Sequence, residues 1–276
     1  MTSYLGRLFY IGFSYYGSQW QPNVRTVQGE LARALTAWSG HEYTPAMLLF
    51  SGRTDKGVSS LGQIVSFDSV EQPNLDAINS KLSDDIVLWA FCESPPEFNS
   101  RYGVLSRHYR YYLDTSMMNL DIFKIRDAAN RLIGTHDFGL LSKPDNGRST
   151  IVTILNTSID TRMDTLVLDM YGTNFVWKMV RKTITLLKMV GMGQYPPEIV
   201  TDLLEGRNPI QGGIKPSPPE GLVLVEAIIP FQMKISKNAV RLVHKKTESL
   251  LQSHRRALRM FNGISKDYLT TGRWTL

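Results

Sequence analysis

The feature that most constrains the fold is a succession of short strand-like and helix-like segments that occurs twice along the chain. Alternating apolar and polar residues favour strands, whereas apolar residues three or four apart favour helices. The first half has expected strands at 7–13, 47–50, 63–67 and 86–91, and expected helices at 27–38 and 75–81. The second half has expected strands at 107–113, 151–160, 165–171 and 222–230, and expected helices at 122–133, 175–190 and 197–205. This order predicts an α+β fold with similar lobes at residues 1–105 and 106–230, followed by a basic helical extension at 231–276.

The segment 51–67 contains the most distinctive group of residues. Asp55 lies between Arg53 and Lys56, and a glycine flanks this group on either side. Glycine permits a tight loop whose backbone can approach a ligand, and the neighbouring cations favour the ionised carboxylate. The strand pattern that follows places Asp55 on a loop that enters a sheet. Taken alone, the same string also fits an ordinary exposed turn.

The composition excludes several classes of protein. No window approaches the roughly 18 to 20 consecutive apolar residues of a membrane span, and the first residues lack the pattern of a secretory signal. The single cysteine, Cys92, excludes an internal disulfide bond and fits a reducing cytoplasm. The five histidines are scattered without metal-binding spacing, so we expect no metal site.

The positive charge of the chain is concentrated at its C-terminal end. The net charge is +6, but residues 231–276 contain ten Lys and Arg against two acidic residues, or +8. The other 230 residues contain 21 basic and 23 acidic residues, or −2. A positive surface of this kind attracts a polyanion such as RNA. A solvated helix face is the alternative explanation.

Four separated segments together resemble the motifs of the TruA-type tRNA pseudouridine synthases, in the order of that family. They are Gly52-Arg53-Thr54-Asp55-Lys56-Gly57-Val58, Phe98-Asn99-Ser100-Arg101, Arg107-His108-Tyr109-Arg110-Tyr111 and Asn174-Phe175-Val176-Trp177-Lys178-Met179-Val180-Arg181. With shorter matches elsewhere, the resemblance covers roughly residues 8–229. The joint match is far more specific than any one string.

The resemblance implies a role for each of five residues. Asp55 is the expected catalytic carboxylate, Arg53 assists extrusion of the target base, and Tyr109 stacks against that base. Arg181 pairs with Asp55, and Leu222 forms an apolar wall of the base pocket.

The resemblance also implies the reaction and the setting. The expected reaction is the isomerisation of uridine to pseudouridine in the anticodon stem-loop of tRNA, around positions 38 to 40, with no metal or organic cofactor. The expected architecture is two ferredoxin-like lobes whose mainly antiparallel sheets join, with the active cleft between them. The expected protein is a cytoplasmic homodimer that binds tRNA and no membrane.

Several positions depart from the commoner pattern of the family. Ile11 replaces a frequent aspartate, Lys56 and Ser59 replace a frequent alanine and histidine, and Trp177-Lys178 replaces a frequent pair of histidines. These differences predict altered contacts with the substrate near the site, while the Asp55, Tyr109 and Arg181 trio is intact.

Two other functions remain as alternatives at this point. One is a non-catalytic RNA-binding protein that uses only the basic C-terminal face. The other is an Asp-dependent hydrolase of nucleotides, which predicts metal dependence. The sequence lacks the second carboxylate beside Asp55 that two-metal chemistry requires.

Overall fold

The computed structural model describes residues 1–145, 147–207 and 210–264. Its strands form one ten-stranded sheet. The strands are β1 (Thr2–Tyr10), β2 (Leu49–Phe50), β3 (Ser59–Ser69), β4 (Ile86–Glu93), β5 (Ser106–Asp114), β6 (Gly134–Asp137), β7 (Ile151–Arg162), β8 (Thr165–Gly172), β9 (Leu222–Ile228) and β10 (Lys234–Ile235). The α-helices are α1 (Val27–Ser39), α2 (Leu75–Asn79), α3 (Ile122–Asn130), α4 (Met179–Gly191), α5 (Ile199–Leu204) and α6 (Lys237–Ile264). Short 3₁₀ turns are η1 (Gly12–Ser14), η2 (Pro45–Met47) and η3 (Pro219–Gly221).

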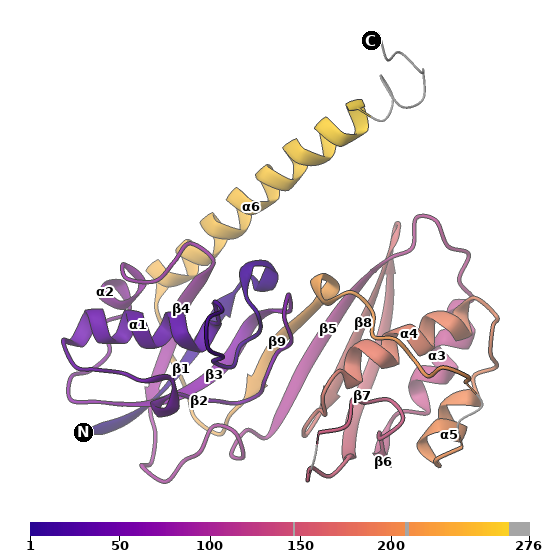
Figure 1. The fold of residues 1–276 in the computed structure, drawn as a ribbon, viewed down its shortest axis with the longest axis horizontal. Coiled ribbons are helices and arrows are strands. Elements are labelled where there is room, and N and C mark those ends of the chain that lie inside the picture. Colours follow the sequence, from indigo (N-terminus) through magenta and orange to yellow (C-terminus); the bar gives the residue numbers. More distant parts are fainter. Residues whose placement is uncertain (146, 208–209, 265–276) are drawn as a thin grey trace.

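The sheet consists of two antiparallel halves joined by one short parallel pairing. Its strand order is β10-β4-β1-β3-β9-β5-β8-β7-β6, with β2 paired to β3. Strands β3 and β9 run parallel and pair Ser59 with Val223 and Ser60 with Leu224. We call this pairing the seam. The expected α+β fold with joined, mainly antiparallel sheets is thus confirmed, and Figure 1 shows the halves side by side.

A glycine allows the two strands to approach closely beside the seam. A Cβ atom on Gly62 of β3 would lie 2.5 Å from the carbonyl oxygen of Val225 in β9. A real side chain at this position would therefore push the halves of the sheet apart.

Each half of the sheet has its own apolar core beneath its helices. Leu31 and Leu35 of α1 and Ile78 of α2 pack on the first half. Ile184 and Leu187 of α4 pack on the second half, together with residues of α3 and α5. Thr26 caps α1, because its side chain accepts a hydrogen bond from the backbone N–H of Gly29. The division of the chain at residues 105 and 230 stays a prediction.

The C-terminal extension begins as part of the first half of the sheet. Strand β10 pairs with β4, and Ala239 of α6 is buried against Phe9 and Val87. Farther along, Lys246 donates hydrogen bonds to two backbone carbonyls of the body. Residues 251–262 of α6 are all exposed, and Figure 1 shows this part of the helix extending away from the body. Residues 265–276 of the predicted extension lie outside the described residues.

The structure differs from the expectations at two elements that matter for the site. Helix α4 begins at Met179 and not at residue 175, because Lys178 has a φ of 63° and its left-handed backbone interrupts helical geometry. Residues 134–137, which lie between the expected helix at 122–133 and the expected strand at 151–160, form an additional strand, β6, at the edge of the second half. Among the described residues, no helix has both the length and the apolar character needed to cross a membrane.

Candidate active site

The loop that carries Asp55 connects β2 to β3. It forms hydrogen bonds with the segment that follows η1. Ser18 makes reciprocal contacts with Thr54: its hydroxyl accepts from the Thr54 N–H at 2.8 Å, and its own N–H donates to the Thr54 carbonyl at 3.1 Å. The Gly57 N–H donates to the carbonyl of Tyr15 at 3.3 Å. Gly57 has a φ of 84°, which favours glycine. These contacts fix the loop that carries Asp55.

Arg181 approaches Asp55 from the other half of the molecule. It is the third residue of α4, and its Nη1 donates to Oδ2 of Asp55 at 2.8 Å. Its Nε donates to the carbonyl of Ser217 at 2.6 Å, so the guanidinium is held at two points. The side chains of Arg181 and Asp55 are only 12% and 20% exposed. This short, partly buried contact places a fixed positive charge against one oxygen of the Asp55 carboxylate.

Trp177 supplies a second donor to the same carboxylate. Its indole Nε1 donates to Oδ1 of Asp55 at 3.0 Å, so both carboxylate oxygens accept a hydrogen bond. The sequence alone indicated Trp177 only as a departure from the family pattern. A signal was present, because residues 177 and 181 are four apart and a helical path would place them on one face.

Tyr109 and Leu222 are placed near the site by strand β9, which pairs with both β5 and β3. In the pairing of β5 with β9, Tyr109 lies opposite Leu224 and Tyr111 opposite Leu222. The register shifts between His108 and Tyr109, and such irregularities re-aim side chains. Because β9 also pairs with the strand that follows the Asp55 loop, these residues are brought to the same region.

The ring of Tyr109 is part of the core of the second half. It is 6% exposed and meets Phe175 edge to face with ring centroids 4.9 Å apart. Burial is the main cause that raises the pKa of Tyr109, with smaller contributions from the charges of Tyr10 and Asp55. Leu222 is similarly buried.

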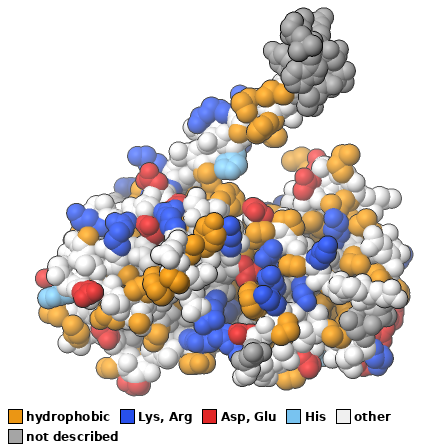
Figure 2. All heavy atoms as spheres, in the orientation of Figure 1, with side chains coloured by type: hydrophobic (Ala, Val, Ile, Leu, Met, Phe, Trp, Pro, Cys, Tyr) orange, Lys and Arg blue, Asp and Glu red, His pale blue; other side chains and the backbone are white. Residues whose placement is uncertain are grey.

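Arg53 lies in a cationic environment beside Asp55 on the same loop. Its side chain is exposed. Partial desolvation lowers the pKa of Arg53, and the positive charges of Arg148 and Arg101 lower it further. Figure 2 shows Lys and Arg side chains on both sides of the hollow between the two halves. A site of this charge suits a phosphate backbone.

Arg107 joins motif segments that are far apart in the sequence. It does so without contacting Asp55. Its guanidinium donates to the carbonyl of Ser51 at 3.1 Å, to that of Thr173 at 2.6 Å and to that of Arg101 at 3.0 Å. It is buried, and burial lowers its pKa. Arg107 thereby fixes the start of the Asp55 loop to the second half of the sheet.

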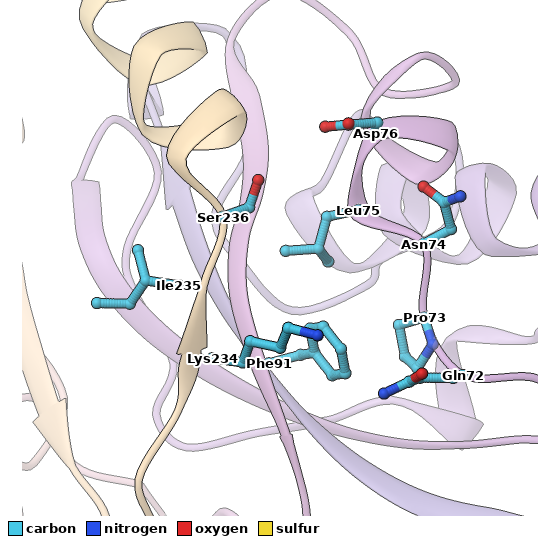
Figure 3. A pocket seen from close by; sticks show the side chains of 9 residues that line it. All are labelled: Gln72, Pro73, Asn74, Leu75, Asp76, Phe91, Lys234, Ile235 and Ser236. Atoms are coloured by element: carbon cyan, nitrogen blue, oxygen red, sulfur yellow. The ribbon is translucent and has the colours of Figure 1, made fainter.

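Other features of the surface lie apart from this site. A pocket of about 370 Å³ is lined by residues of α2, β4 and β10, including Leu75, Phe91 and Lys234, and by none of the predicted site residues. In the close-up of this pocket (Figure 3), the Lys234 side chain lies over the ring of Phe91. The described residues include no cluster of three or more His, Cys, Asp or Glu that is suited to a metal ion.

Comparison with known proteins identifies the family. The family profile described as tRNA pseudouridine synthase matches residues 128–230. The tRNA pseudouridine synthase A of Methanosarcina acetivorans is 40% identical over 230 residues, which cover 79% of this chain and 81% of the relative. That of Pyrococcus abyssi is 34% identical over 222 residues, covering 80% and 82%. That of Methanothermobacter thermautotrophicus is 34% identical over 262 residues, covering 94% and 92%.

These identities extend over most of both chains and point to the pseudouridine synthases, a class of isomerases. The chain belongs to the tRNA pseudouridine synthase family, as the resemblance of its motifs predicted.

Proposed function

We propose that this protein isomerises uridine to pseudouridine in the anticodon stem-loop of tRNA, around positions 38 to 40, with Asp55 as the catalytic carboxylate. The observation that carries the proposal is the pair of Asp55 and Arg181, which come from opposite halves of the sheet and meet at 2.8 Å. A partly buried carboxylate with a fixed cation is suited to act as a nucleophile or a base.

The proposed reaction needs few groups from the protein. The C1′–N1 bond of the nucleotide breaks, the uracil turns, and its C5 bonds to C1′, while C5 loses a proton and N1 gains one. Because the product is an isomer of the substrate, no oxidant or reductant is consumed.

The target uridine must leave its stack before it can reach Asp55. Extrusion of a base costs a few kcal/mol and requires contacts that replace stacking. We assign Tyr109 and Leu222 to the apolar surface that receives the uracil, since both are buried in the core beside the site. Arg53, exposed on the loop of Asp55, is assigned to extrusion of the base.

The direct test is to incubate the protein with unmodified tRNA transcripts and to map new pseudouridines. Modification at positions 38 to 40 is the expected result. Modification elsewhere would contradict the assigned position, and none at all would contradict the activity. Activity retained in the presence of a metal chelator would exclude the hydrolase alternative, which predicts metal dependence.

Three further properties are part of the proposal. A homodimer is expected from the family resemblance, and sedimentation equilibrium measures it directly. The expected location is the cytoplasm. The exposed part of α6 is assigned to tRNA binding, because α6 contains seven Lys and Arg against one acid, Glu248.

The assignment of α6 predicts a change in the salt dependence of binding. Truncation after residue 231 is a poor test, because β10 and the first turns of α6 belong to the body. We expect the triple substitution of Arg255, Arg256 and Arg259 to Gln to weaken tRNA binding about tenfold. The plot of log K against log[salt] should become shallower by ~1 for each phosphate that the variant no longer neutralises.

A charge-matched control is available on the body. Arg33, Arg162 and Arg207 are also exposed, and each pairs with a nearby carboxylate. Their replacement by Gln removes the same charge and should leave more of the salt slope intact. Equal slopes for the α6 variant and the unmodified protein would refute a role of α6 in tRNA binding.

A further inference from the structure

The two oxygens of the Asp55 carboxylate are held in different ways. Oδ2 accepts from Arg181, a charged and largely buried donor whose guanidinium is also fixed by the carbonyl of Ser217. Oδ1 accepts from the indole of Trp177, a neutral donor on a residue that is 43% exposed. The contact with Arg181 is therefore the lasting one, and the contact with Trp177 is the one that an incoming molecule can displace.

The surroundings of Trp177 also suit a side chain that moves. It precedes α4 in a turn, and the next residue, Lys178, has a left-handed backbone, which is uncommon for a residue with a side chain. The ammonium group of Lys143 lies 4.0 Å from the centre of the indole ring. The Lys143 N–H also donates to the carbonyl of Trp177 at 2.8 Å. The backbone at Trp177 is thus fixed, while the ring is held by contacts with side chains, which can re-form after a rotation of the indole.

We propose that Trp177 is a gate: its indole occupies Oδ1 of Asp55 in the free enzyme and leaves when the target uridine enters. Oδ2 stays paired with Arg181, and Oδ1 becomes the oxygen that faces the substrate. The inference rests on the proposed function of Asp55. It assigns to Trp177 a positioning role that acts through this carboxylate.

Removal of a gate and removal of a residue that stabilises the transition state should change kcat/KM in opposite directions. A hydrogen bond that is present only in the free enzyme must be broken when the substrate binds. Its removal should therefore favour the complex, whereas removal of a contact made in the transition state lowers the rate. Phenylalanine keeps an aromatic ring at the position, although a smaller one, and removes the N–H donor.

The test is the Trp177→Phe variant, assayed with unmodified tRNA transcripts. The expected result is a KM for tRNA that falls about 3- to 10-fold and a kcat/KM that rises by the same factor, the effect of removing one charge-assisted hydrogen bond. When Asp55 is replaced by Ala, the donor has no partner, so adding Trp177→Phe should change the Kd for tRNA less than about twofold. A fall in kcat/KM, or the same tightening in both backgrounds, overturns the gate.

A control and an independent signal complete the experiment. Trp89 also donates its indole N–H, to the carbonyl of Leu61 at 2.8 Å and outside the site, so Trp89→Phe should leave KM unchanged. The emission of Trp177, taken as the difference between unmodified protein and Trp177→Phe, should change when tRNA is added. This change should be absent in Asp55→Ala.

The fluorescence signal keeps the two proposals separable. Turnover by the unmodified protein with a fall in kcat/KM for Trp177→Phe defeats the gate and leaves the proposed function standing. Absence of pseudouridine defeats the proposed function. In that case, an unchanged emission of Trp177 with bound tRNA defeats the gate as well, and a change that depends on Asp55 supports it.

Discussion

Replacement of Asp55 by Asn is expected to lower kcat for pseudouridine formation by at least about 10³-fold, while the affinity for tRNA changes little. Asparagine has nearly the shape of aspartate, and its side chain can still accept a hydrogen bond from Trp177 or Arg181. It lacks the negative charge that a nucleophile or base requires. Single-turnover assays measure the rate, and fluorescence anisotropy with labelled tRNA measures binding.

The matched control for this variant is Asp160→Asn. Asp160 also pairs with an arginine, Arg162, but both are exposed on β7. This variant should retain full activity. Turnover by Asp55→Asn at the unmodified rate would end the assignment of Asp55 as the catalytic carboxylate. Binding of tRNA without turnover by the unmodified protein would favour the non-catalytic RNA-binding protein.

Replacement of Arg181 by Met is expected to have the second largest effect, a loss of about 10²- to 10³-fold in kcat. The substitution leaves a partly buried carboxylate without its cation and leaves the carbonyl of Ser217 without one donor. Loss of one partner of a buried pair is destabilising, and at this partial exposure we expect about 1–3 kcal/mol. Denaturant unfolding measures the stability and single-turnover assays the rate.

Arg181→Lys separates charge from geometry. Lysine keeps the positive charge but cannot contact Asp55 and Ser217 at once in the way that the arginine fork does. We expect this variant to recover most of the stability and only part of the rate. If Arg181→Met were as active as the unmodified protein, the pairing would be structural only.

The sequence carried enough information for the types of elements and for the main pair of the site. Strands such as β7 and β8 follow from alternation, and α1 from its apolar face and the cap at Thr26. Asp55 and Arg181 were named because their motifs resemble a known family. Their contact at 2.8 Å agrees with the predicted pairing. The catalytic role of Asp55 and the substrate roles of the other site residues stay predictions.

The remaining features depend on contacts that no local pattern encodes. The seam joins residues about 164 positions apart, Ser60 and Leu224, and a parallel pairing of two residues leaves no periodic signal. The true start of α4 depends on the backbone of Lys178, whose left-handed conformation is unusual for lysine. The role of Ser18 in holding Thr54 was missed, because Ser18 lies outside the four segments on which the resemblance depends.

The seam joins strands that are far apart in the sequence, and this has a consequence for the folding of the enzyme during its synthesis. The first half of the sheet is synthesised first and contains Asp55, but Arg181 and strand β9 follow more than a hundred residues later. During synthesis, Asp55 is therefore present long before Arg181 and Leu222. With Asp55 as the proposed catalytic carboxylate, a chain arrested before residue 181 is expected to lack activity, because the cation that pairs with Asp55 has not yet been synthesised.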